Sequence, residues 1–283
     1  MTPYSIPADP EFYEEALHFI DVCKTDCTCP DHWHFMWASL KAAGLRRGVY
    51  HQYAVFKNVL ANRLHAGSRI FIAGAADAGS LHVLNAVAGN TRVEFTVMDR
   101  CQAPLTMVER YGRQHRVHLS TRLGDISNLT QDTCWDVILI HNTLILMDRE
   151  ARINALKQAA RQLAPNGVIL CNVRYNTPTD ARDSSLQADE CASIIQKLQT
   201  TFAAHPAVVE LISPLILPYV KAQNESLAMR PTKDRLTDEI RQAGLEVFEE
   251  YPDTSVMPSI VSSRNSALNI QAELLLLRRA PNR

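Results

Sequence analysis

Residues 69–100 read RIFIAGAADAGSLHVLNAVAGNTRVEFTVMDR, and this stretch decides the fold. The run RIFIAG is short and apolar and ends in glycine, as a buried strand does, whereas SLHVLNAVA has apolar residues at helical spacing. A second apolar run, VEFTVM, follows and leads into Asp99. A strand, a helix and a second strand of these lengths predict two parallel strands joined by a right-handed crossover.

The same alternation continues to residue 173. We expect helices at 102–115 and 149–164 and strands at 117–123, 136–141 and 168–173. Apolar strands separated by helices are typical of a mostly parallel sheet that is covered on both faces. The residues APNG at 164–167 are interpreted as a turn, because Pro165 cannot continue a helix and Gly167 accepts a positive φ. The sequence therefore predicts an α/β, doubly wound fold.

The flanking segments extend this core. Apolar residues at spacings of three and four predict helices within 11–65, which we interpret as an N-terminal helical cap at 1–66. The domain at 67–283 carries an insertion at about 176–230, expected to form a lid, with a helix near 186–204 and then the proline-interrupted run LISPLILPYV. The runs LEVFEEYP and IQAELLLLRR predict a final antiparallel hairpin.

Composition restricts the partners. The chain has 283 residues, 46% hydrophobic and 21% charged residues and a net charge of −1, so it has no general attraction to nucleic acid or to an acidic membrane. A small-molecule substrate fits better, and a homodimer is left open. The first residues lack the features of a signal peptide, which predicts a cytoplasmic protein. The seven cysteines are an odd number, and reduced thiols are expected rather than disulfides.

The first strand-to-helix turn is the first candidate site. Small side chains there let the backbone approach a ligand, although turns rich in Gly and Ala also form simply because they pack well. The candidate cofactor-binding residues of this turn are Gly74, Ala75, Ala76, Asp77 and Gly79.

Polar residues at the ends of later strands extend this candidate cofactor site. Asp99 lies 25 residues after Gly74, where a carboxylate can accept both hydroxyls of a ribose; the alternative is a cap of the helix that follows. Asp125 and Ile126 can hold an adenine ring, or form an ordinary turn. The next strand ends in His141 and Asn142, where ligands of such sheets bind, and Arg100 beside Asp99 completes the set of candidates.

With these residues in order, the sequence from Ser68 to Val173 resembles the class I (Rossmann-like) S-adenosylmethionine-dependent methyltransferases. The resemblance rests on the glycine-type turn, Asp99, the GDI element, WDVI followed by HN, and LAPNGVIL, and with the C-terminal helix and hairpin it covers about half the chain. It implies a seven-stranded sheet and S-adenosylmethionine as the cofactor. Three positions depart from the family's first turn, acidic-x-Gly-x-Gly-x-Gly: Ile72 replaces the acidic residue, and Ala76 and Ala78 replace glycines. The partner of the cofactor's amino group is then expected elsewhere, at Asp77 or in the cap.

Aromatic residues of the cap and the loop after residue 173 are further candidates. Tyr53, with Tyr50, His51 and Phe56, could face a sulfonium, whose charge is attracted to an aromatic ring; packing is the alternative for such a stripe. For catalysis the candidates are His141, as a base for a hydroxyl or amine acceptor, and Tyr175.

The segment CKTDCTCPDHWH places Cys23, Cys27, Cys29, His32 and His34 close together. Thiolate and imidazole suit zinc, but the spacing lacks the paired Cys-x-x-Cys of common zinc modules. We therefore interpret it as a turn between helices with reduced cysteines, and we expect no metal.

Three functions remain open. The first is methyl transfer to a small molecule, in secondary metabolism. The second is a cyclase or lyase on the same fold, in which the amino group of S-adenosylmethionine attacks its own side chain and releases methylthioadenosine, as in azetidine-2-carboxylate synthases that resemble methyltransferases. The third is a non-catalytic binding or scaffold subunit. A dinucleotide oxidoreductase is disfavoured, since Ala76 interrupts the Gly-x-Gly-x-x-Gly pattern after Gly74.

Overall fold

The computed structural model describes residues 9–28, 33–46, 48–129, 134–175, 185–252 and 272–281. Its centre is a seven-stranded sheet with the order β3-β2-β1-β4-β5-β7-β6. Strands β1 to β5 pair in parallel, and β7 is antiparallel to both β5 and β6. The predicted α/β, doubly wound, mostly parallel fold is confirmed. The strands are β1 (Arg69–Ala73), β2 (Glu94–Asp99), β3 (Leu119–Leu123), β4 (Trp135–His141), β5 (Leu163–Arg174), β6 (Leu245–Pro252) and β7 (Ala272–Arg279).

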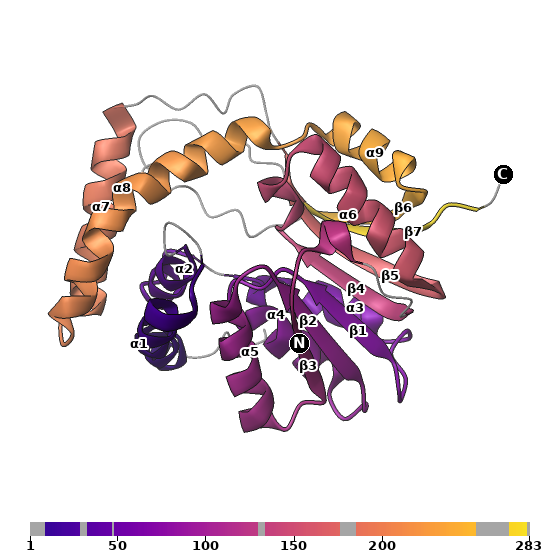
Figure 1. Ribbon diagram of the computed structural model, residues 1–283, viewed down its shortest axis with the longest axis horizontal. Coiled ribbons are helices and arrows are strands. Elements are labelled where there is room, and N and C mark those ends of the chain that lie inside the picture. The colour runs from indigo at the N-terminus through magenta and orange to yellow at the C-terminus, as the bar shows by residue number, and fades with distance from the viewer. Residues whose placement is uncertain are drawn as a thin grey trace.

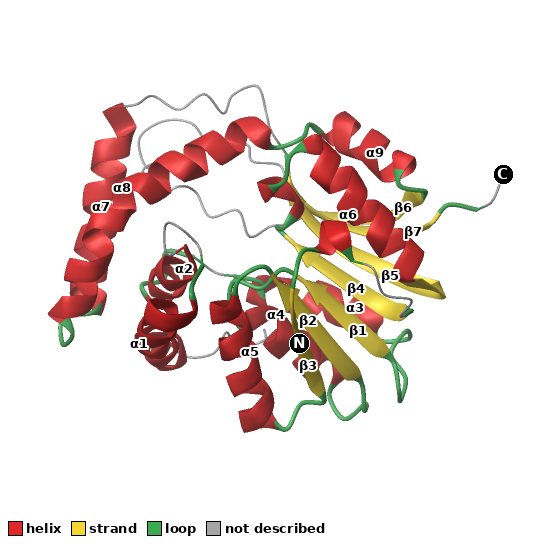
Figure 2. Ribbon diagram, viewed as in Figure 1, coloured by secondary structure: helices red, strands yellow, loops and turns green. Residues whose placement is uncertain are grey.

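Helices cover both faces of the sheet (Figure 2). Neighbouring residues of β1 point to opposite faces, so Ile72 packs in one buried cluster with α4 and α5, while Phe71 packs in the other with α6 and α9. This explains why the central strands are apolar at every position rather than at alternate ones. The four helices are α4 (Gly79–Ala88), α5 (Gln102–His115), α6 (Arg149–Gln162) and α9 (Lys233–Gln242).

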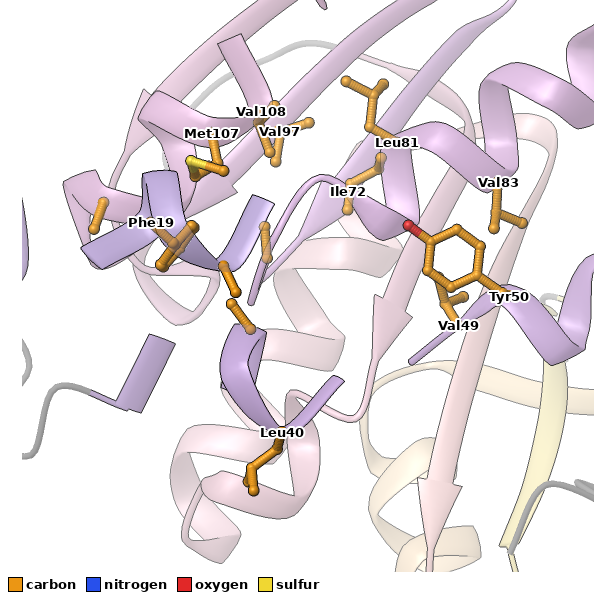
Figure 3. Close-up of a cluster of buried hydrophobic side chains, with 14 of the residues drawn as sticks. Phe19, Leu40, Val49, Tyr50, Ile72, Leu81, Val83, Val97, Met107 and Val108 are labelled. Atoms are coloured by element: carbon orange, nitrogen blue, oxygen red, sulfur yellow. The ribbon is translucent and has the colours of Figure 1, made fainter. Parts of the chain in front are cut away.

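The N-terminal part is helical, as predicted. It comprises α1 (Asp9–Asp26), α2 (Trp33–Ala42), a short 3₁₀ helix (Tyr50–Gln52) and α3 (Tyr53–Leu60). Figure 3 shows Phe19 of α1 and Leu40 of α2 in the same cluster as Val97 of β2 and Met107 of α5. The cap therefore shares buried apolar surface with one face of the sheet.

The insertion contains two helices, α7 (Ser185–Thr201) and α8 (Pro206–Met229), which pack against each other (Figure 1). The first confirms the predicted helix. The proline-interrupted run is also helical, with Pro214 and Pro218 inside α8. Its residues Ile212 and Ile216 are fully buried, so burial of an apolar face outweighs the cost of interior prolines. None of the described helices is long and apolar enough to span a membrane.

The interpretation of 164–167 is corrected. These residues belong to β5, where Leu163 pairs with Trp135 and Val168 pairs with Val137, so the four residues between them form an irregularity in the ladder. Gly167 does not have a positive φ. Glycine is required there by close approach instead, because a Cβ would lie 2.8 Å from the carbonyl oxygen of Trp135.

Candidate functional site

A cavity of about 520 Å³ lies at the carboxyl ends of β1, β2 and β4. Its volume is in the range of small-molecule sites. The chain passes from β1 to β2 on one side and returns to β4 on the other, and ligands of open α/β sheets bind at this switch of direction. Ten residues predicted from the sequence line the cavity: Gly74, Ala75, Ala76, Asp77, Asp99, Arg100, Asp125, Ile126, His141 and Asn142.

The first turn depends on one glycine. Gly74 has a φ of +82°, and a Cβ there would collide with Oγ1 of Thr143, which itself donates to the carbonyl oxygen of Ala73 over 2.9 Å. Ala76 and Ala78 do not have positive φ values. The backbone at the last two positions of the turn is therefore compatible with alanine, and glycine is needed only at the first.

Asp99 joins the first turn to the tip of β2. Its Oδ2 accepts from the backbone N–H of Ala75 and its Oδ1 from that of Cys101, each over 2.8 Å. Burial raises the pKa of this carboxyl above its ordinary value of 3.8, although these N–H groups act in the opposite direction. The cap interpretation and the ligand interpretation are compatible, because the same side chain binds the start of α5 and lines the cavity.

Asp125 follows β3 and is held in a similar way. Its Oδ1 accepts from the backbone N–H and the hydroxyl of Ser127, both over 2.8 Å. Its other oxygen lies 3.5 Å from Nε of Arg100, whose side chain is largely exposed. Ile126 is buried beside it and also lines the cavity. Asp125 therefore presents one oxygen, beside an apolar side chain and a cation, at this end of the cavity.

At the end of β4 the backbone takes an uncommon conformation. Asn142 has a φ of +56°, and its N–H donates to the carbonyl oxygen of Asn172 over 3.2 Å. Asparagine tolerates this left-handed region better than most residues. Its Oδ1 is buried and accepts no hydrogen bond from the described part of the chain. A buried acceptor of this kind at a cavity wall is suited to a ligand N–H or O–H. His141 precedes it and is half-buried at the same wall.

Asp77 is engaged by the cap. Its Oδ2 accepts from Nζ of Lys41 over 2.6 Å and from Nε1 of Trp37 over 3.2 Å, while its Oδ1 accepts from the backbone N–H of Gly79 over 2.7 Å. Lys41 also contacts Glu15 over 2.8 Å. Burial opposes the charge of Asp77, but the Lys41 ammonium outweighs it and lowers the pKa of this carboxyl. One buried cation thus lies between two carboxylates where α1 and α2 meet the first turn.

Three predicted residues do not line the cavity. Tyr175 is buried and its hydroxyl donates to Glu273 over 3.0 Å. The ring of Tyr53 lies 5.8 Å from the Lys57 ammonium, on the same helix. Gly79 contacts Asp77 instead, because its backbone N–H donates to Oδ1 of that residue. Tyr53 is partly buried and packs against the hydrophobic core, which is the alternative considered above for the aromatic residues of the cap.

The sequence reasoning missed several residues that line the cavity. Trp37 comes from α2, Thr143 follows β4, and Arg230 follows α8. Arg174, the last residue of β5, adds another cation beside Arg100 and Arg230. Trp37 precedes Lys41 by one helical turn, so both lie on one face of α2, but nothing in the sequence pairs that face with Asp77. Arg230 follows a helix whose position depends on tertiary packing, and no sequence pattern marks it.

Comparisons with solved structures identify the architecture. A methyltransferase from Leishmania major that depends on S-adenosylmethionine matches with a TM-score of 0.54 and 14% identity, over 95% of this chain and 85% of that one. The mitomycin 7-O-methyltransferase matches with a TM-score of 0.50 and 16% identity, over 99% and 74%. A protein described for the conversion of a disulfide bond into a thioacetal group during echinomycin biosynthesis matches with a TM-score of 0.51 and 15% identity, over 82% and 81%.

Neither a protein-family profile nor a curated protein sequence matches this chain. The structural similarity at these identities concerns the fold, and the sheet order with β7 antiparallel is the order of that fold. The chain thus has the class I fold of the S-adenosylmethionine-dependent methyltransferases.

Proposed function

We propose that this protein is an S-adenosylmethionine-dependent methyltransferase that acts on a small molecule. The observation that carries the proposal is the cavity at the switch point of the sheet, where Gly74, Asp99 and Asn142 converge. The near-neutral net charge of the chain supports a small acceptor rather than a nucleic acid.

The residues present fit an adenosine group. Gly74 lines the cavity with backbone alone, and Asp99 keeps lone pairs on both oxygens beyond its two backbone contacts. Asn142 supplies a buried acceptor without a partner among the described residues. We assign Asp99 to the ribose hydroxyls, and Asp125 with Ile126 to the adenine.

The chemistry of the proposed reaction requires alignment more than acid or base strength. When bound, S-adenosylmethionine supplies a methyl group that is activated by a positively charged sulfur. The chain's own residues orient the acceptor and exclude water. His141, at the end of β4, is the side chain we assign as base if the acceptor is a hydroxyl or an amine. Tyr175 takes no part in this assignment, because its hydroxyl is directed to Glu273.

A second candidate is the intramolecular reaction, and one observation favours it. The family's acidic position after β1 is Ile72, which is fully buried, and Asp77 is already paired with Lys41. A carboxylate without a cation would stabilise the ammonium form of the amino group, whereas this arrangement favours the neutral amine that can attack. The amine nitrogen would bond to the γ-carbon while the carbon–sulfur bond breaks, releasing methylthioadenosine and a proton.

One incubation separates the two reactions. The purified protein is mixed with S-adenosylmethionine, with and without a small-molecule extract of the source cells, and the nucleosides are separated by chromatography. A methyltransferase leaves the cofactor intact until an acceptor is added, and then forms S-adenosylhomocysteine. Methylthioadenosine formed without acceptor, beyond the amount in a mixture without protein and together with azetidine-2-carboxylate, would instead establish the intramolecular reaction. The Asp99→Ala variant serves as the matched control, since it should reduce either product.

A further inference from the structure

Three side chains that are far apart in sequence meet at the edge of the cavity. Cys27 follows α1, His34 lies in α2 and Cys101 precedes α5. The Sγ atoms of Cys27 and Cys101 are 3.8 Å apart, and Sγ of Cys27 is 3.9 Å from Nδ1 of His34. The potential ligand atoms of the three residues all lie within 4.8 Å of one another. Two thiols and one imidazole therefore converge on one point.

These separations agree with a tetrahedral metal site. With Zn–S bonds of about 2.3 Å and Zn–N bonds of about 2.0 Å, tetrahedral angles place two sulfur ligands about 3.8 Å apart and a sulfur and a nitrogen about 3.5 Å apart. The sulfur–sulfur distance equals the first value, and the distance from Sγ of Cys27 to Nδ1 of His34 exceeds the second by a few tenths of an ångström. The ligand atoms of His34 and Cys101 lie within 4.8 Å of each other, so these two side chains would move closer together when the ion binds. A disulfide would require the two Sγ atoms to be about 2.0 Å apart.

The chemistry and the burial of Cys27, His34 and Cys101 also favour a zinc site. Thiolate and imidazole are ligands that zinc prefers over harder cations. Cys101 and His34 are buried, and both also line the cavity. Further contacts fix the same junction, because the hydroxyl of Thr106 donates to Asp26 over 3.0 Å, next to Cys27. The ligands are therefore held by elements that already pack together.

We propose that Cys27, His34 and Cys101 bind one zinc ion at the wall of the cavity. Each thiol loses its proton on binding, so that two thiolates offset the charge of the ion. The remaining ligand of a tetrahedral site comes from outside this group. Cys29 and His32, which the sequence placed in the same cluster, lie outside the described residues. The site would link the α1–α2 junction to the tip of β2, and it does not depend on which reaction the cavity performs.

The metal content of the full-length protein tests this assignment. The protein is stripped of metal with a chelator under reducing conditions, incubated with zinc chloride, desalted and measured by elemental analysis. We expect about one zinc ion per chain in the wild type, and a loss of most of it in Cys27→Ser, His34→Ala and Cys101→Ser. Cys134→Ser is the matched control, because Cys134 is exposed and outside the group, and it should keep the wild-type content.

Cobalt(II) gives a second readout that needs no variant. Loading the wild type with cobalt should produce the strong visible absorption of a tetrahedral ion and the near-ultraviolet band of thiolate ligation, and added zinc should remove both. This spectrum decides the matter even if a ligand variant fails to fold. The assignment is overturned if the wild type retains no zinc, if Cys101→Ser retains as much as the wild type, or if cobalt binds without thiolate absorption.

Discussion

Replacement of Lys41 by methionine should destabilise the protein more than any exposed lysine replacement. Nζ of Lys41 is fully buried and lies 2.6 Å from Asp77 and 2.8 Å from Glu15. Methionine conserves most of the side-chain volume, so the change removes a charge without leaving a large cavity. It leaves the buried carboxylate of Asp77 and the partly buried carboxylate of Glu15 close together without the cation between them.

The expected loss is about 3–5 kcal/mol of unfolding free energy near pH 7, the range measured when one member of a buried ion pair is removed. The double variant Lys41→Met/Asp77→Asn should recover part of this loss, since only Glu15 then remains ionisable at the site. Lys24→Met is the control: its side chain is 60% exposed, and its ion pair with Asp21 spans 3.6 Å. An exposed pair contributes about 1 kcal/mol or less.

The pH dependence gives an independent check. In the wild type Lys41 lowers the pKa of Asp77 below 3.8, so the stability from this group is present above that pH and is lost as the pH falls through the folded-state pKa. In Lys41→Met the pKa of Asp77 should instead be raised, and the pKa of Glu15, which burial already raises in the wild type, should be raised further. The folded state then binds more protons than the unfolded state, and the stability of the variant rises as the pH falls, by up to about 1.4 kcal/mol per pH unit for each proton retained.

Urea unfolding followed by circular dichroism at pH 5, 6, 7 and 8 measures both effects. The deficit of Lys41→Met relative to the wild type should be smallest at pH 5 and largest at pH 8. A deficit below about 1 kcal/mol at pH 7, the value for an exposed pair, would refute the reasoning. So would a deficit that does not change with pH.

Two further predictions concern single residues with tight surroundings. Gly74→Ala should cost about 1–3 kcal/mol of unfolding free energy, because φ is +82° and the new Cβ would collide with Thr143. The double variant Gly74→Ala/Thr143→Ala should recover only the part due to the collision, and thermal unfolding measures both losses. Arg152→Met should cost up to about 3–5 kcal/mol, because Arg152 and Glu239 are both buried and their Nε and Oε2 atoms are 2.8 Å apart, while Arg149 and Arg235 still partly compensate Glu239. The exposed Arg241→Met is its control in urea unfolding; equal losses in the two arginine variants would contradict this assignment.

The strand ends of the site could be predicted from the sequence. In a parallel sheet the carboxyl ends of the strands meet at one edge, so Asp99, Asp125 and Asn142 were expected together once the strands were recognised. The turn around Gly74 was predicted for the same reason. These residues follow from local periodicity and chain order alone.

Contributions from outside the sheet could not be predicted in this way. The contact of Lys41 with Asp77 depends on how α2 packs against the first turn, and no local pattern encodes that packing. The sequence predicted only that Cys101, like the other cysteines, is a reduced thiol, because 74 positions of sequence separate it from Cys27. The prolines of α8 suggested an interrupted segment, and only the burial of Ile212 and Ile216 explains the continuous helix.

We expect the cavity at the carboxyl ends of β1, β2 and β4 to bind the adenosine group of S-adenosylmethionine. Titration calorimetry with S-adenosylhomocysteine tests it most directly, on the wild type and on Asp99→Ala, with circular dichroism to confirm that the variant is folded. We predict binding to the wild type and an affinity weaker by about 1–3 kcal/mol in Asp99→Ala, through the loss of hydrogen bonds to the ribose. The absence of binding to the wild type at millimolar ligand, or an unchanged affinity in the variant, would contradict the claim.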